Sequence, residues 1–436
     1  MNPISVGLLG IVLLLFLLIL GMPIALVMML VGVLGISYLT SIPAAFPVVA
    51  KTVYETAAHY PYTIIPLFVL MGGLAAIGGL TQKLFMAFDK WFRNWPGGLG
   101  IATIVSCAFF AALSGSSVAA AAAMGSIAIP EMRRFHYAPQ LAVGVVAAGG
   151  TLSFLIPPSL GFVVYGVLTE QSIGKLFIAG LLPGFFLSLA FIIVIIILVK
   201  NNPALAPLIS GEIGWKEKIS ALFDIWETIL VFAIVIGGIY LGIINPTEAG
   251  ALGATILFLL TLGKRKLTWP NLSSSLREAA RISVLVLFLV AGANVFSYFL
   301  ALTTIPMTIS SWLADLPLSR YFILTIIVLI YLLLGCFLDA ISMMVLTMPV
   351  IFPVISNLGF DPIWFGVICV IMMEAGLITP PVGLNIYTLA GVVKDIPSET
   401  IFKGALPFLG AMLGVVILIT IFPQIALFLP RMMIGK

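Results

Sequence analysis

The chain has 436 residues, of which 62% are hydrophobic and only 8% are charged, and its mean hydropathy is +1.26. A soluble domain of this size cannot hide so much apolar surface, so the composition excludes a water-soluble protein. The formal net charge of +4 is spread along the chain, which excludes a nucleic-acid-binding patch. The polar–apolar alternation of an outer-membrane barrel is also absent. We therefore expect an all-α polytopic protein of the lipid bilayer.

The N-terminal apolar stretch, residues 4–39, is too long for one straight span, because about 20 residues cross the hydrocarbon. Gly21 and Pro23 predict a turn between two helices. The first residues carry neither a basic segment nor a small-residue cleavage site, so we expect a retained helix and not a signal peptide. Further apolar segments lie near residues 62–80, 98–130, 138–170, 174–199, 228–243, 247–263, 282–302, 320–356, 362–393 and 401–429.

Polar stretches interrupt these segments at few places. Residues 201–227 are the longest interruption, and KWFRNWP at 90–96 and SWLADLP at 311–317 are typical of short interfacial helices with Trp at the membrane surface. Asn245, Pro246 and Glu248 predict a capped helix start. Cys107, Cys336 and Cys369 lie in apolar segments without metal-ligand spacing, so we interpret them as core residues.

The chain contains an internal repeat. The proline pair in SFLIPPSLG (153–161) recurs in LITPPVGLN (377–385), at an offset of 223 residues (380 − 157). Other prolines, tryptophans and glycines recur at offsets of 220 to 224, so 62–187 and 282–413 form one repeated unit. The remaining regions are expected to be N-terminal scaffold helices (1–61), connecting scaffold helices (188–281) and a C-terminal helix end (414–436).

The charges indicate that the two copies have opposite orientations. Lys83, Lys90 and Arg93 precede the hairpin region of the first copy, whereas the equivalent residues 303–317 contain no Lys or Arg. Arg133 and Arg134 likewise align with Ser356 and Asn357. Since cytoplasmic loops are enriched in Lys and Arg, this is an inverted-topology repeat, as in secondary transporters.

Each copy also has a candidate re-entrant hairpin. Residues 97–131 have basic residues at both ends, and LSGSS (113–117) lies at their centre. The second copy has CFLDAIS (336–342) there, with Asp339 aligned to Ser116. Small polar residues suit a hairpin tip inside the membrane, although two spanning helices with a tight turn are the alternative.

The broken helices and hairpin tips predict an ion site. A proline pair frees helix carbonyls, which can coordinate Na⁺, while half-helix N-termini favour an anion. Asp339 and Glu374 are the carboxylates deepest in apolar sequence, and each is an ion-site candidate against a purely structural role. Asn385 follows the second break and either binds a substrate carboxylate or simply begins a helix. Arg and Lys are absent from mid-membrane sequence, so Na⁺ and half-helix N-termini would have to neutralise an anionic substrate.

These motifs resemble the large membrane subunit, the DctM-like M subunit, of tripartite ATP-independent periplasmic (TRAP) transporters. The matching stretches are dispersed over nearly the whole chain: ALSGSSVAAAAAMGSIAIPEM (112–132), GGTLSFLIPPS (149–159), INPTEAGALGA (244–254), LDAISMMVLTMPV (338–350) and GLITPPVGLN (376–385).

The resemblance implies an elevator-type symporter of the bacterial inner membrane, in which a transport domain moves against a fixed scaffold. It implies Na⁺-coupled import of an organic acid, no other cofactor, a periplasmic binding protein and a small four-helix membrane subunit, which we expect to be a separate chain. The family's first sodium site falls on Ser114, Ser116, Ser153, Ile156 and Pro158. The second falls on Gly335, Asp339, Gly376, Thr379 and Val382. Weaker candidates for substrate binding are Ser117, Thr151, Ser342 and Asn385.

Two other kinds of protein are alternatives to a TRAP transporter subunit: an intramembrane protease and a stand-alone carrier. LSGSS resembles the serine loop of an intramembrane protease, but His59 and His136, the bases such an enzyme would use, both lie near segment ends. The chain is therefore expected not to be an enzyme. A stand-alone ion-coupled anion carrier without a binding protein is the other alternative. C4-dicarboxylates, sialic acids, keto acids and sugar acids all stay open as substrates.

Overall fold

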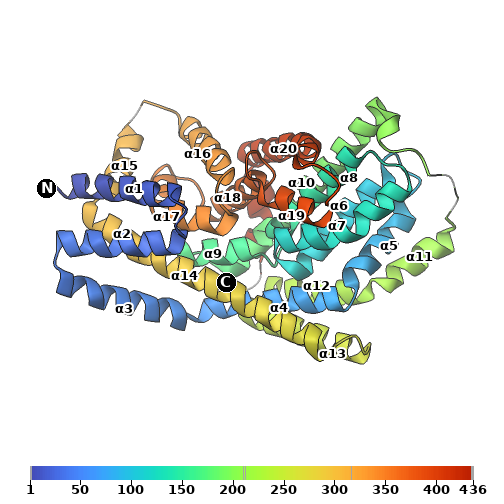
Figure 1. Ribbon diagram of the computed structural model, residues 1–436, viewed down its shortest axis with the longest axis horizontal. Coiled ribbons are helices and arrows are strands. Elements are labelled where there is room, and N and C mark those ends of the chain that lie inside the picture. Colours follow the sequence, from blue (N-terminus) through green and yellow to red (C-terminus); the bar gives the residue numbers. More distant parts are fainter. Residues whose placement is uncertain (1, 210, 212, 316, 434–436) are drawn as a thin grey trace.

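A computed structural model describes residues 2–209, 211, 213–315 and 317–433, and within these ranges the chain is helical without a strand (Figure 1). The α-helices are α1 (Pro3–Ile19), α2 (Ile24–Leu39), α3 (Ile42–Ala58), α4 (Ile64–Ile77), α5 (Leu80–Phe92), α6 (Gly98–Ser114), α7 (Ser117–Arg134), α8 (Pro139–Leu155), α9 (Leu160–Leu168), α10 (Ile173–Asn201), α11 (Trp215–Asp224), α12 (Trp226–Tyr240), α13 (Pro246–Gly263), α14 (Trp269–Thr303), α15 (Ile305–Asp315), α16 (Arg320–Gly335), α17 (Ala340–Asn357), α18 (Pro362–Leu377), α19 (Leu384–Val392), α20 (Ser398–Ile421) and α21 (Gln424–Met432). Two 3₁₀ turns are η1 (Tyr60–Thr63) and η2 (Pro203–Leu205).

The helices that correspond to each other in the two copies confirm the internal repeat. α7 and α17 both have 18 residues and are separated by the offset of 223 found in the sequence. Each copy has an arm helix (α4, α14), a short helix (α5, α15), a helical hairpin (α6–α7, α16–α17), a broken helix (α8–α9, α18–α19) and a long helix (α10, α20). The region boundaries that the sequence repeat predicts at 187, 281 and 413 fall inside α10, α14 and α20. They mark the limits of the repeated sequence and do not coincide with helix ends.

Both hairpins return to the face from which they start. The Tyr137 hydroxyl, just after α7, accepts a hydrogen bond from the Leu99 N–H at the start of α6 (3.2 Å). In the second copy the Arg320 guanidinium, at the start of α16, lies 5.2 Å from the ring centre of Phe360, just after α17. These contacts show that each helix pair is a closed antiparallel hairpin.

The two broken helices run antiparallel to each other. Arg133, near the start of α8, forms a 2.8 Å salt bridge with Asp395, which follows α19, and holds the pKa of that carboxyl below its usual value. On the opposite face the Tyr165 hydroxyl of α9 donates to the carbonyl of Pro362, the first residue of α18 (2.7 Å). The end of each broken helix therefore meets the start of the other, and the predicted inverted topology is confirmed.

The two faces differ in charge. Lys90, Arg93, Arg133 and Arg134 lie at the open end of the first hairpin, and Lys394 lies beside them after α19. By the positive-inside rule this is the cytoplasmic face. The predicted capped helix start at Asn245 is confirmed on α13, where Asn245 and Glu248 form a reciprocal capping box.

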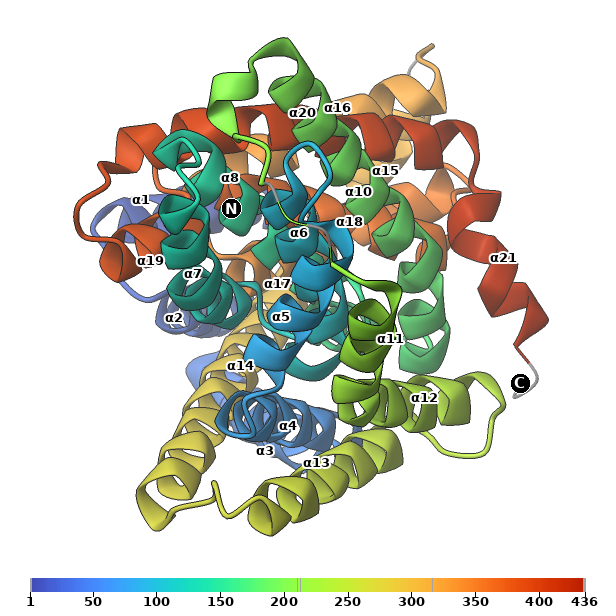
Figure 2. The same cartoon turned by 90° about the vertical axis from the view of Figure 1, so that its right-hand side faces the viewer.

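The helices form two groups. The arm group contains α1–α4 and α12–α14, in which α14 packs against α2, α3 and α4, and α13 packs against α4. The hairpin group contains α6–α10 and α16–α20, with α20 packed across α8 and α10. Figure 2 shows α20 (red) across the top of the molecule, with α13 and α14 (yellow) at the bottom.

The predicted interfacial helices need correction. In the first copy the helix is α5 (Leu80–Phe92), and most of the segment 90–96 forms the turn that follows it, where Gly97 has φ +72°. The helix begins ten residues early because Leu84, Phe85 and Phe88 bury an apolar face. In the second copy α15 covers most of 311–317, and Leu316 lies outside the described residues.

The contact between α8 and α20 holds the two copies together and can be tested. A Cβ on Gly404 would lie 2.1 Å from the Gln140 carbonyl oxygen, so we expect Gly404→Val to force the helices apart and destabilise the protein by about 1–3 kcal/mol. Thermal unfolding in detergent measures this loss. Gly410→Val is the matched control, because no atom lies within 4 Å of that site; equal melting temperatures would contradict the prediction.

Candidate functional site

Each proline pair frees helix carbonyls that a continuous helix would bond. In an α-helix the carbonyl of each residue accepts from the N–H of the residue four positions later. Pro157 follows Ser153 by four positions, and Pro380 follows Gly376 by four positions. Because proline has no N–H, neither carbonyl can form its helical hydrogen bond. The prolines of each pair are joined by a cis peptide bond. In the first copy the Ser159 hydroxyl donates to the Phe154 carbonyl instead. The Ser153 carbonyl thus becomes available to a ligand.

The first hairpin tip docks on the first break. Gly115 has φ +60° and connects α6 to α7, and a Cβ there would lie 3.0 Å from the Pro158 carbonyl oxygen. Glycine adopts this conformation without strain and has no Cβ to crowd the carbonyl. The hydroxyls of Ser114 and Ser153 are buried without a hydrogen-bond partner among the described residues. This first junction unites the residues predicted for one sodium site.

The second tip docks on the second break in the same manner. A Cβ on Gly335 would lie 2.7 Å from the Cα of Gly376, and the Val382 N–H donates to the Cys336 carbonyl (3.2 Å). The Thr379 hydroxyl donates to the Ala375 carbonyl (2.6 Å). The second junction thus brings together the residues predicted for the other sodium site.

Ser116 and Asp339, which align in the sequence, occupy the same structural position. Ser116 caps α7 by accepting from the Ala119 N–H, and Asp339 caps α17 through one oxygen that accepts from Ile341 and Ser342 N–H (both 3.1 Å). The second oxygen of the half-buried Asp339 carboxylate makes no hydrogen bond to the protein in the described part of the chain. A carboxylate oxygen, a hydroxyl and freed carbonyls form a donor set that suits a hard cation.

A cavity of about 650 Å³ lies beside the first junction, on its cytoplasmic side. Ser114 and Ser116 line it from the tip, Gly72 and Gly73 line it from α4, and Glu278 is the charged residue among its lining. The first turn of α7 faces the cavity, and its unbonded N–H groups favour an anion. Sequence reasoning missed the α14 wall, although its polar residues share one helix face at i, i+3, i+4 and i+7: Asn271, Ser274, Ser275 and Glu278.

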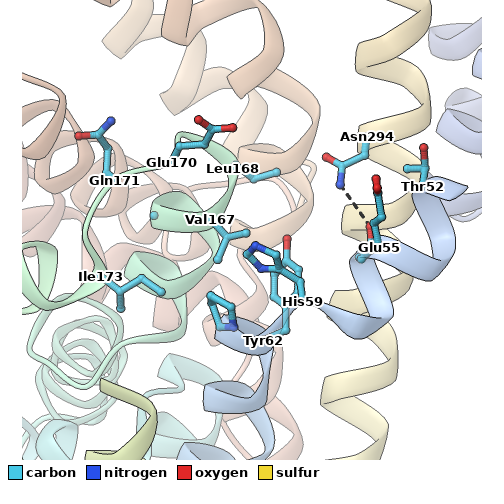
Figure 3. Close-up of a pocket in the computed structure, with 13 residues that line it drawn as sticks. Thr52, Glu55, His59, Tyr62, Val167, Leu168, Glu170, Gln171, Ile173 and Asn294 are labelled. Atoms are coloured by element: carbon cyan, nitrogen blue, oxygen red, sulfur yellow. Dashed lines mark hydrogen bonds between the residues drawn. The ribbon is translucent and has the colours of Figure 1, made fainter. Parts of the chain in front are cut away.

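A second cavity, of about 620 Å³, lies on the opposite face between the two helix groups (Figure 3). Its arm-group wall carries Thr56 and Asn294, which are joined by a 3.3 Å hydrogen bond. Figure 3 shows Glu170 and Gln171 on the wall across from Asn294. It has two carboxylates and no Lys or Arg in its lining. Two smaller cavities, of about 380 and 340 Å³, also follow the boundary between the groups.

The four weaker substrate candidates do not line the cytoplasmic cavity. Thr151 is fully buried and donates to the Ala148 carbonyl (2.6 Å). Ser117 and Ser342 are buried in the first turns of α7 and α17, and Asn385 is buried in the first turn of α19. Ile156, by contrast, lines the 340 Å³ apolar cavity with its side chain, so only its backbone is available to an ion.

Antiparallel broken helices, two hairpin tips docked on the breaks and a polar cavity beside them define a secondary transporter of the inverted-repeat class. Residues 11–425 match the family described as "Tripartite ATP-independent periplasmic transporter, DctM component", and the chain belongs to this family. It is thus a transporter permease subunit and not an enzyme, and it is a multi-pass protein of the inner membrane.

Several relatives are similar over most of their length. The C4-dicarboxylate TRAP transporter large permease protein DctM of Pseudomonas aeruginosa is 38% identical over 385 residues, which cover 88% of this chain and 89% of that protein. The sialic acid TRAP transporter large permease protein SiaM of Vibrio cholerae is 31% identical, with 86% and 88% covered. The 2,3-diketo-L-gulonate TRAP transporter large permease protein YiaN of Escherichia coli is also 31% identical, with 93% and 94% covered.

Among solved structures, the YdaH transporter of Alcanivorax borkumensis has a similar fold. The TM-score is 0.66, and the likeness covers 87% of this chain and 88% of that one. The two sequences are only 14% identical, so this likeness concerns the fold alone.

Reactivity of introduced cysteines tests which face each cavity opens to. In a background without native cysteines, we expect a membrane-impermeant thiol reagent to label Ser275→Cys only from the cytoplasmic side, because Ser275 lines the 650 Å³ cavity. Thr52→Cys, in the 620 Å³ cavity, is the matched control and should react only from the opposite side. Labelling of both positions from the same side would contradict the assigned orientation.

Proposed function

We propose that the chain imports an organic acid with Na⁺, by an elevator motion, as the large subunit of a tripartite transporter. The main support for sodium coupling is the pair of junctions, where each hairpin tip contacts a broken helix. Na⁺ needs several oxygen ligands that are held without water, and a docked tip brings oxygens from two segments together. Ser114, Ser116, Ser153, Ile156 and Pro158 would hold one ion, and Gly335, Asp339, Gly376, Thr379 and Val382 the other.

The cavity beside the first junction is the proposed substrate site. Its volume of about 650 Å³ accommodates a small organic acid, and the α7 N-terminus together with a nearby Na⁺ would neutralise the carboxylate. No Lys or Arg lines this cavity, so substrate binding would depend on sodium. The named substrates of three relatives are a C4-dicarboxylate, sialic acid and 2,3-diketo-L-gulonate, which all carry a carboxylate, and that of a fourth is isethionate, which carries a sulfonate.

The boundary between the two helix groups supports the elevator motion. Four cavities lie along it, and Gly72, Gly73 and Ala76 of α4 face the small residues Ala119, Ala122 and Ala123 of α7. Small side chains and unfilled space leave few contacts to break when one group slides past the other. The arm group would be the scaffold and the hairpin group the moving domain.

The partners follow from the tripartite family. A periplasmic binding protein would deliver the organic acid, and a small membrane subunit would enlarge the scaffold. The exposed apolar side chains of α1, α2 and α3, among them Phe16, Leu34 and Phe46, offer that subunit a lipid-buried surface.

Asp339 provides the sharpest test of sodium coupling. We expect Asp339→Ala to make uptake into proteoliposomes nearly independent of an imposed Na⁺ gradient, because the free carboxylate oxygen is lost. Asp361→Ala is the matched control: Asp361 caps α18 by the same pattern, accepting from Ile363 and Trp364 N–H, so both variants lose a cap worth about 0.5–2 kcal/mol. If Asp339→Ala keeps the sodium dependence of the wild type, Asp339 is not an ion ligand.

Dependence on a binding protein tests the tripartite arrangement. We expect no uptake of free organic acid by the reconstituted membrane subunits until the cognate binding protein is added. A thermal-shift screen of that binding protein against dicarboxylates, sialic acids, keto acids and sugar acids identifies the substrate. Equal uptake with and without the binding protein would favour a stand-alone carrier.

A further inference from the structure

The apolar cavity of about 340 Å³ lies between the two helix groups. α6 and α10 of the hairpin group form most of its wall, and Phe232 of α12 lines it from the arm group. Ser188 is the one polar residue among the described residues that line it, and its hydroxyl donates to the Gly184 carbonyl one turn earlier (2.8 Å). Since this hydroxyl is already bonded, the cavity suits neither water nor a charged ligand.

The cavity lies at mid-membrane depth. α10 is an apolar helix of 29 residues, long enough to cross the bilayer. Its cavity-lining residues begin with Leu181, eight residues after the helix start (181 − 173), and end with Ile192, nine residues before the helix end (201 − 192). At about 1.5 Å per residue, the cavity lies about 12 Å or more from either end of α10. This part of a bilayer contains acyl chains and not headgroups.

The cavity opens on a lipid-facing surface of α10. Phe185 and Leu189 line it and are 60% and 41% exposed. Ile193 and Ile197 continue the same row at intervals of four residues, and they are 47% and 51% exposed. An exposed apolar row on a membrane-spanning helix faces hydrocarbon, so the cavity is a recess in a surface that acyl chains already cover.

The inner wall of the cavity is the back of the first junction. The Ile156 side chain lines the cavity, and a Cβ on Gly184 would lie 2.4 Å from its Cγ1 atom, so Ile156 packs directly on α10. Ala112 lines the cavity two residues before Ser114, the last residue of α6. An occupant of the cavity would therefore contact both the hairpin group beside the first tip and the arm group at Phe232.

We propose that the end of a phospholipid acyl chain occupies this cavity. An empty space of this size would leave its walls without dispersion contacts, and the adjoining hydrocarbon can fill it. An acyl chain needs no hydrogen bond, and it is narrow enough to enter beside Phe185 and Leu189. Because the walls belong to both helix groups, the chain would rearrange when the groups slide. This consequence rests on the proposed elevator motion, whereas the site itself does not.

Photolabelling with a lipid probe tests the site. The full chain is reconstituted in vesicles of phosphatidylethanolamine and phosphatidylglycerol that contain a phospholipid with a diazirine at the end of one acyl chain. Mass spectrometry then identifies the labelled residues. We expect labelling at Ala108 of α6 and Phe232 of α12, which line the cavity from the two helix groups. A phospholipid with the diazirine on its headgroup is the matched probe and should label neither residue.

A variant that fills the cavity distinguishes its occupant from lipid that only surrounds the protein. We expect Ala108→Phe to lower chain-end labelling of Phe232 about fivefold or more, because the added ring takes the space of the acyl chain. Ile193→Phe is the matched control: it adds a ring to the exposed row of α10 outside the cavity, so labelling of Phe232 should not change. Should Ala108→Phe not fold, Val105→Phe fills the same cavity from the same helix.

Three results would overturn the proposal. The first is no labelling of Phe232 by the chain-end probe, and the second is undiminished labelling in the folded filling variant. The third is loss of labelling when the small membrane subunit is reconstituted together with the chain, which would assign the cavity to that subunit. The labelling requires no transport, so these outcomes are independent of the proposed function.

Discussion

The structure depends on one constraint: inside an apolar interior, a backbone carbonyl freed from its helix must find another partner. The first proline pair frees the Ser153 carbonyl, and the second leaves the Gly376 carbonyl to accept from the Thr379 N–H in place of its helical partner (3.1 Å). Each hairpin tip supplies the surface that covers them, and the glycines Gly115, Gly335 and Gly376 allow the backbones to meet. The hairpins, the broken helices and the proposed ion sites are therefore parts of one solution to this constraint.

The two helix groups differ in how well they pack. Inside the hairpin group, Gly144 of α8 and Gly404 of α20 bring two backbones into direct contact, and the core there is nearly fully buried. Along the boundary with the arm group, cavities of 340 to 650 Å³ follow one another. Since dispersion energy is lost wherever atoms lack neighbours, this loosely packed boundary supports the proposed elevator motion.

Much of the fold was predictable because proline, glycine and charge act locally. The turn at Gly21, the capping box at Asn245 and both helix breaks are properties of a few adjacent residues. The α5 helix was not predicted in full, because its early start comes from Leu84, Phe85 and Phe88 packing into the core. The sequence did not predict that α14 lines a cavity, because the polar face of a long helix looks the same in sequence whether it faces a cavity or the solvent.

The sequence by itself determined the membrane class, the inverted repeat and the positions of the tips and breaks. Hydropathy and basic residues act through the solvation of each segment, and a proline pair acts through its own covalent geometry, so none of them needs a distant partner. Only the tertiary structure decided that each tip rests on the break of its own copy. It alone also decided that the end of each broken helix meets the start of the other, as the Tyr165–Pro362 hydrogen bond and the Arg133–Asp395 salt bridge show. Such contacts join residues about 40 to 260 positions apart, and their partners are selected by the packing of the whole helix group.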